Sequence, residues 1–170
     1  MKKLTILLIL TSLLSAEPSP QEQFDLGMQY LLGDGVKQDK QKAAIYLQKS
    51  SDQGDAEAQY NLALMYYLGD GVKQDVAKTL TLLERSAKQG YQKAIDNVGR
   101  IAMQIMKFDK ALYWLKINAK NGDLKANYLI AEIYINKEDL KNAKIYAQKA
   151  IDSGDEDAKV LWKEYKLANY

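Results

Sequence analysis

Stretches of helix-forming residues recur along the chain, and apolar residues within them keep a helical spacing. In one stretch Tyr60, Leu62 and Tyr66 stand at such a spacing around the small residue Ala63. Several stretches start with Asp and close with Gly, which are the N-cap and C′ signals of an α-helix. The pattern predicts helices that start at Asp39, Asp75, Asp109 and Asp139 and close at Gly54, Gly90, Gly122 and Gly154.

A further helical run follows each of these glycines, so the predicted helices form pairs. These runs open with Ala58, Ala94, Ala126 and Ala158. Small side chains on facing helices let the helix axes approach to about 8 Å. The first helix of each pair carries such a residue, namely Gly27, Ala63, Gly99 or Ala131. Four helix pairs and one last helix therefore account for the chain from about Gln21 onward.

A sequence repeat supports this arrangement. Residues 30–39 (YLLGDGVKQD) return 36 positions later as residues 66–75 (YYLGDGVKQD), with nine of the ten residues identical. A fixed period of this size marks units that stack because none can bury its apolar face alone. Glycines in the turn between the helices are expected to supply positive φ, and they are Gly33, Gly35, Gly69 and Gly71. The third and fourth pairs are four residues shorter, and their turns are expected at Lys107-Phe108 and Asn136-Lys137-Glu138.

These motifs make the chain similar to the Sel-one-like repeat family, whose members are related to tetratricopeptide repeats. The second repeat matches the family pattern at Ala58, Leu62, Ala63, Tyr66, Gly69, Gly71, Val72, Asp75, Lys78, Ala87 and Gly90. The resemblance implies an all-α fold, a right-handed α-solenoid of about four helix pairs with a C-terminal capping helix. It also implies a protein-binding adaptor. The absence of Cys departs from the disulfide-rich branch of the family.

In this superfamily the first helices of the pairs line a concave surface, so the resemblance implies a groove there. Its predicted N-terminal half is mostly aromatic and aliphatic and consists of Phe24, Met28, Leu31, Glu57, Tyr60, Leu64 and Tyr67. Its predicted C-terminal half carries mixed charge and consists of Lys93, Asp96, Arg100, Met103, Lys125, Tyr128, Glu132 and Ile135. Such a surface suits a peptide with an apolar and a polar segment. The alternative is that several of these side chains, Leu31 and Tyr67 above all, only pack between repeats.

The N-terminus has the order of a secretory signal peptide. Lys2 and Lys3 precede an apolar run from Leu4 to Leu14, and Ala16 is a plausible cleavage point. We therefore expect a signal peptide at 1–16, a linker at 17–20, the solenoid at 21–170, and an exported, periplasmic or secreted protein; an uncleaved membrane anchor is the alternative. Removal of 1–16 lowers the 24 basic residues to 22, which balances the 22 acidic ones. A neutral mature chain is not expected to bind nucleic acid.

Enzymatic chemistry is not visible in the sequence. The chain has no His and no Cys, and no Ser after residue 16 has Lys three positions on, so nucleophilic triads and the S-x-x-K motif of β-lactamases are excluded. The G-x-G turns lack a third glycine and a preceding strand, so they do not predict a nucleotide site. We expect no cofactor, no metal and a peptide or protein partner. The alternatives are a β-lactam-binding protein like the cysteine-rich relatives, or an inhibitor or immunity partner of one exported enzyme.

Overall fold

The computed structural model describes residues 17–170, and the predicted signal peptide and its cleavage site lie outside them. The described residues form α-helices and one short 3-10 helix, and they contain no strand. The elements are α2 (Pro20–Leu32), α3 (Lys40–Asp52), α4 (Ala56–Leu68), α5 (Val76–Lys88), α6 (Gln92–Gln104), α7 (Phe108–Lys120), α8 (Leu124–Asn136), α9 (Leu140–Asp152), α10 (Glu156–Glu164) and η1 (Leu167–Asn169). Over this range no helix has the length and apolar character needed to cross a bilayer.

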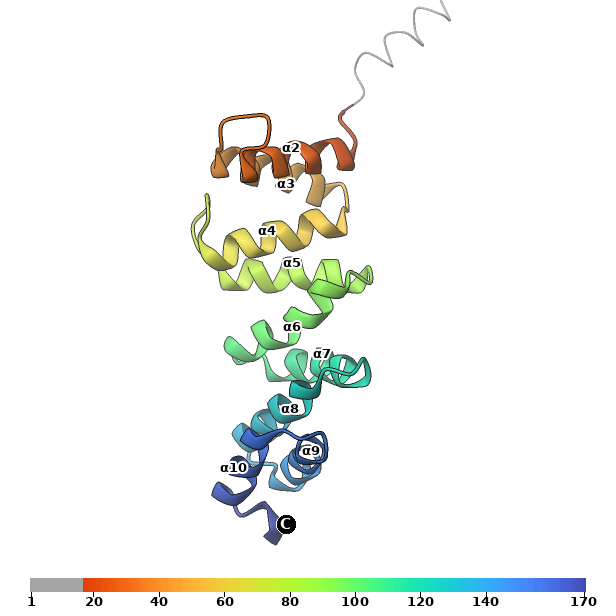
Figure 1. The fold of residues 1–170 in the computed structure, drawn as a ribbon, viewed down its shortest axis with the longest axis vertical. Helices are drawn as coiled ribbons and strands as arrows, with labels where there is room; N and C mark the ends of the chain where they lie inside the picture. The colour runs from red at the N-terminus through yellow and green to blue at the C-terminus, as the bar shows by residue number, and fades with distance from the viewer. Residues whose placement is uncertain (1–16) are drawn as a thin grey trace, which may run out of the picture.

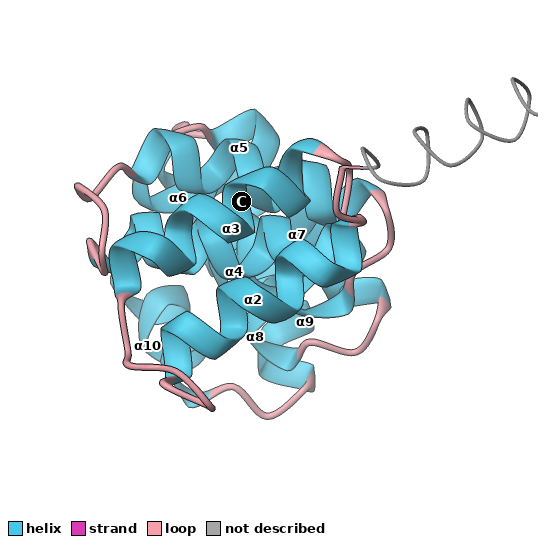
Figure 2. Ribbon diagram, turned by 90° about the horizontal axis from the view of Figure 1, so that it is seen from above, coloured by secondary structure: helices cyan, strands magenta, loops and turns pink. Residues whose placement is uncertain are grey.

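The helices stack in chain order into an elongated solenoid (Figure 1). Each helix packs on the next one in sequence, in the pairs α2/α3, α4/α5, α6/α7 and α8/α9, while α10 packs on α9 and on η1. Seen along the stack, the pairs are rotated relative to one another (Figure 2). The predicted all-α solenoid of four pairs with a last helix is confirmed.

Small residues on the first helix of a pair lie in close contact with the second helix. A Cβ atom on Gly27 would lie 2.8 Å from Cγ of Leu47, and one on Gly99 would lie 2.9 Å from Cγ of Leu115. Both distances are too short for carbon atoms, so these leucines occupy the space that the missing side chains leave. The alanines that open the helical runs are also fully buried: Ala58, Ala94, Ala126 and Ala158.

The predicted helix starts are confirmed for three of the second helices. The side chains of Asp39, Asp75 and Asp139 each accept a hydrogen bond from the backbone N–H three residues on, at 2.9, 2.9 and 3.1 Å. Each therefore satisfies one of the helix donors that have no partner within the helix. The first helix has a stronger cap, since Ser19 and Glu22 form a reciprocal capping box before Pro20.

The prediction that Asp109 starts a helix is wrong. The N-cap of α7 is Lys107, which makes no capping hydrogen bond through its side chain, and Asp109 already lies in the first turn. The turn before α7 is only three residues long, and Met106 adopts a left-handed φ of 57° within it. This tight turn spans residues 105–107 and starts the helix at Phe108, so the expected Lys107-Phe108 turn overlaps it only at Lys107. The turn after α8 spans residues 137–139, which is one residue later than predicted.

The glycine turn of the second repeat rests on the repeat before it. The four turn glycines have positive φ as predicted, between 70° and 79°. Gly71 is also confined, because a Cβ atom there would lie 2.5 Å from the backbone carbonyl carbon and oxygen of Lys40. Beside this contact Lys40 Nζ lies 2.8 Å from Asp70 Oδ1. Gly35, the equivalent residue of the first repeat, has no atom within 4 Å of such a position.

Candidate functional site

Two cavities lie between successive first helices in the C-terminal half of the solenoid. The cavity between α6 and α8 has a volume of about 490 Å³ and is lined by Arg100, Met103, Gln104, Lys125, Tyr128 and Leu129. The cavity between α8 and α10 has a volume of about 280 Å³ and is lined by Tyr128, Glu132, Ile135, Asn136, Asp157, Val160, Leu161, Glu164 and Tyr165. We call these two adjoining cavities the first-helix groove. Tyr128 lines both.

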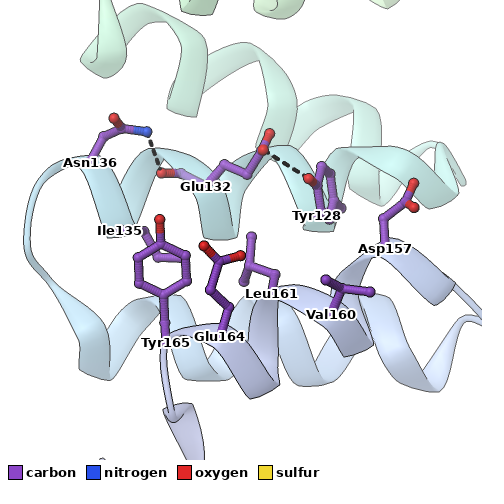
Figure 3. Close-up of a pocket in the computed structure, with 9 residues that line it drawn as sticks. All are labelled: Tyr128, Glu132, Ile135, Asn136, Asp157, Val160, Leu161, Glu164 and Tyr165. Atoms are coloured by element: carbon purple, nitrogen blue, oxygen red, sulfur yellow. Dashed lines mark hydrogen bonds between the residues drawn. The ribbon is translucent and has the colours of Figure 1, made fainter.

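Side chains of α8 and α10 face each other across the second cavity (Figure 3). The hydroxyl of Tyr128 donates a hydrogen bond to Oε1 of Glu132 at 2.8 Å, and Nδ2 of Asn136 donates to the backbone oxygen of Glu132 at 2.8 Å. Burial and, after it, the hydrogen bond to Glu132 raise the pKa of Tyr128 to about 12. The Tyr128 phenol therefore stays neutral at physiological pH and fixes the orientation of the carboxylate.

Carboxylates give the walls of this cavity a negative charge. Glu132 and Glu164 lie on opposite sides, and Asp157 is paired with Lys125 at 2.9 Å. Leu161 and the half-buried Ile135 supply apolar surface between them. The cavity thus suits a group that has an apolar stem and a hydrogen-bond donor at its end. Among residues 17–170, no three acidic side chains come close enough to hold a metal ion.

The cavity between α6 and α8 is more apolar, and its one guanidinium is held in place. Arg100 donates to the backbone oxygen of Asp96 at 2.7 Å and to Oδ2 of Asp123 at 2.6 Å. Its charge is therefore largely balanced by Asp123. Met103 and Leu129 contribute half-buried apolar surface to the same cavity.

The predicted groove residues of the first two repeats line neither cavity. Phe24, Met28, Leu31, Leu64 and Tyr67 are half-buried on α2 and α4, and Lys93 is exposed on α6. The remaining residues, Tyr60 and Glu57, are engaged by a side chain that the sequence did not single out. The ring of Tyr91 lies 5.3 Å from that of Tyr60, and its hydroxyl donates to Oε1 of Glu57 at 3.1 Å. The structure therefore brings together only part of the predicted set, since Lys93 and Asp96 also line neither cavity. The predicted residues that do line them are Arg100, Met103, Lys125, Tyr128, Glu132 and Ile135.

The contribution of α10 was missed because this helix was interpreted only as a cap. With a repeat period of 32 residues, the equivalents of Lys125, Tyr128 and Glu132 on the next helix are Asp157, Val160 and Glu164. Extending the repeat by one unit would thus have placed these residues in the groove. The repeat could not have predicted a role for Tyr91, because the equivalent residues of the other repeats are aspartates. These residues are Asp55, Asp123 and Asp155.

Tandem helix pairs, short turns and a row of small buried residues define the chain as an α-solenoid of the tetratricopeptide-like class. The sequence model of the Sel1 repeat matches residues 23–55, 56–91, 107–123 and 125–155. The chain therefore belongs to the Sel1 repeat family, the Sel-one-like repeats. Proteins built from these repeats are generally scaffolds for protein interactions.

A curated relative matches over a short segment. The Sel1-repeat-containing protein YjcO of Escherichia coli strain K12 is 43% identical over 51 residues, which are 30% of this chain and 22% of the relative. The matched segment therefore spans less than a quarter of that protein. The likeness concerns the repeat itself.

Two solved structures have a similar fold over most of the chain. A Sel1 repeat protein from Oxalobacter formigenes superimposes with a TM-score of 0.64 and 26% identity, over 84% of this chain and 62% of that one. A protective antigen of uropathogenic Escherichia coli with an SLR fold gives a TM-score of 0.62 and 28% identity, over 86% of this chain and 34% of that one.

Proposed function

We propose that the protein is a non-enzymatic scaffold that binds a segment of a partner protein in the first-helix groove. The observation that carries this proposal is the pair of adjoining cavities between α6, α8 and α10, which share Tyr128. One cavity is mostly apolar and the other is acidic, so the groove suits a peptide whose apolar residues precede or follow a hydrogen-bond donor or cation. No observation favours the β-lactam-binding alternative over this one.

Tyr128 is the best single probe of the groove. Aromatic side chains on a rigid helix are frequent anchors of peptide binding, and truncating an anchor costs about 2 kcal/mol, or roughly 30-fold in Kd. Tyr60 is a poorer probe than its position suggested, because its truncation would also remove the ring contact with Tyr91.

The test is affinity capture from an extract of the source cell, with the wild-type protein, Tyr128→Ala and Tyr113→Ala compared side by side. Tyr113 is the matched control, since it is a 61% exposed tyrosine on α7 that lines neither cavity. We expect a partner that the wild type and Tyr113→Ala retain and Tyr128→Ala loses, with unchanged circular dichroism. A partner that Tyr128→Ala retains in full would show that binding occurs on another surface.

We also propose that the protein acts after export. The support is the N-terminal order of two lysines, an apolar run and a small residue at position 16. The partner would then be a protein of the same exported compartment, either a component that the scaffold assembles or one enzyme that it inhibits. Cell fractionation followed by capture from the exported fraction alone would separate these partners from cytoplasmic ones.

A further inference from the structure

A third cavity lies outside the first-helix groove, where α7, α8 and α9 meet. It has a volume of about 290 Å³ and is lined by Lys116, Ala119, Lys120, Asn127, Tyr146 and Lys149. Three of the six lining residues are lysines, and none is acidic. The cavity is therefore a concentration of positive charge on a chain whose basic and acidic residues are otherwise nearly balanced.

Two of these lysines are held in place by aromatic rings. The rings of Tyr134 and Tyr146 stack with centroids 5.6 Å apart. Nζ of Lys116 donates to the hydroxyl of Tyr134 at 3.2 Å and lies 5.8 Å from the Tyr146 centroid, and Nζ of Lys149 lies 4.7 Å from that centroid. Cation–π contacts attract an ammonium group but leave its charge unneutralised. The hydrogen bond to the hydroxyl of Tyr134 raises the pKa of Lys116, which stays charged at neutral pH.

The three lysines of this cavity have no carboxylate beside them. Some cations elsewhere do meet a carboxylate across the repeat boundary, in the pairs Lys40–Asp70 at 2.8 Å, Lys110–Glu84 at 2.6 Å and Lys137–Asp109 at 2.8 Å. Over residues 17–170 no carboxylate oxygen lies within 4.0 Å of Nζ of Lys116, Lys120 or Lys149. Like charges gathered without a counterion repel one another, and a bound anion would relieve that repulsion.

We propose that this cavity binds a compact oxyanion with at least two negative charges, such as a phosphate-bearing group. Each ammonium group offers three N–H donors and acts as a point charge, which is the manner in which lysine binds phosphate. The amide of Asn127 adds a further donor, and the lysines approach from α7 and α9, two different repeats. The cavity admits a phosphate or pyrophosphate. The group can belong to a soluble compound or to a lipid headgroup.

The first repeat provides an internal control. Its rings Tyr30 and Tyr46 also stack at 5.6 Å, and Nζ of Lys49 lies 5.4 Å from the Tyr46 centroid, as Lys149 lies over Tyr146. Lys42 lies 5.3 Å from the Tyr30 centroid, but its Nζ also lies 3.8 Å from Oδ2 of Asp39, so its charge is partly balanced. Lys49 therefore has the ring contact of Lys149 beside one lysine that is paired with a carboxylate, instead of two lysines that are not.

The experiment is a calorimetric titration with pyrophosphate at low ionic strength, using the wild type, Lys116→Gln, Lys149→Gln and Lys49→Gln. We expect saturable binding to one site, at least ~10-fold weaker in the two cavity variants and unchanged in Lys49→Gln, and weaker for all at high salt. If Lys116→Gln lowers the melting temperature, Lys120→Gln replaces it in the comparison, because Lys120 also lines the cavity and its side chain is exposed. The same weakening of pyrophosphate binding is then expected for Lys120→Gln.

A parallel arm separates the two sources of the anion. Vesicles containing phosphatidic acid, whose phosphomonoester can carry two negative charges, are compared with vesicles of neutral phosphatidylcholine in a sedimentation assay. Binding of pyrophosphate assigns a soluble ligand, and Lys116-dependent binding to phosphatidic acid alone assigns a lipid headgroup. The proposal is overturned if neither probe binds. It is also overturned if Lys49→Gln weakens binding as much as Lys116→Gln, because the anion would then be attracted by the overall charge of the protein and not by this cavity.

Discussion

Replacing the glycines of the two equivalent turns by alanine separates two physical effects. Gly35 and Gly71 have nearly the same backbone conformation, with φ of 70° and 71°. Both substitutions therefore incur the cost of an alanine in the left-handed region, about 1 kcal/mol. At Gly71 the new Cβ atom would also lie 2.5 Å from the backbone of Lys40, whereas at Gly35 it meets open space.

The second effect should dominate. Because the atoms at Lys40 belong to the backbone, the turn and α3 must move apart, and overpacking of this kind costs about 1–3 kcal/mol. We expect Gly35→Ala to lower the free energy of unfolding by about 1 kcal/mol and Gly71→Ala by roughly 2–4 kcal/mol. In a domain of this size, each 1 kcal/mol corresponds to about 2–4 °C in Tm.

The assay is urea unfolding followed by circular dichroism, with the slope compared between variants to verify that the transition is unchanged. Equal losses for Gly35→Ala and Gly71→Ala would refute the inference that the second turn rests on α3. A loss near zero for both would refute the positive φ itself. Gly54→Ala, with φ of 98° and no neighbour within 4 Å, should behave like Gly35→Ala.

Two further predictions concern Tyr91 and the N-terminus. Burial and the hydrogen bond to Glu57 raise the pKa of Tyr91 from 10.0 to about 12, so between these values the folded protein keeps a proton that the unfolded chain loses. Stability should therefore fall as pH rises through this window, and Tyr91→Phe should lessen that fall in melting experiments; an identical pH profile would show that Tyr91 titrates normally. Export should leave a protein that begins at Glu17, and an intact mass that still includes Lys2 would contradict cleavage after Ala16.

The helix pairs could be predicted from the sequence because the repeat presents each element several times. The N-cap at Asp75 and the turn at Gly71 belong to a copied segment, so one interpretation had to fit both copies. Asp109 was misassigned because its repeat has a shorter turn, and the left-handed conformation of Met106 has no signal in the residue type. Turns and caps that occur in only one repeat were thus the least predictable part of the fold.

The candidate site was predictable only where it follows the repeat. Tyr128 and Glu132 were found from their register on the first helices, and they do line a cavity. Tyr91 was missed because it departs from the repeat, and its contact with Tyr60 depends on how two successive repeats are rotated. The cavity lined by Lys116, Lys120 and Lys149 likewise depends on how α7 and α9 pack together, and the residue pattern of one helix does not predict that packing. Whether any of these residues binds a partner stays a prediction.

The open space beside Gly35 has a consequence for how the chain can change in length. The turn at Gly35 has the same backbone conformation as the turn at Gly71, which must fit against the backbone of Lys40. At Gly35, however, no described residue lies where Lys40 lies beside Gly71. The first repeat therefore already has the shape of an internal repeat. A duplicated unit of 36 residues, such as 39–74, would keep the repeat period and carry its own copies of Lys40 and Gly71, so each glycine turn would rest on the start of a helix as it does now. The chain could then lengthen by whole repeats with this contact made again in each one.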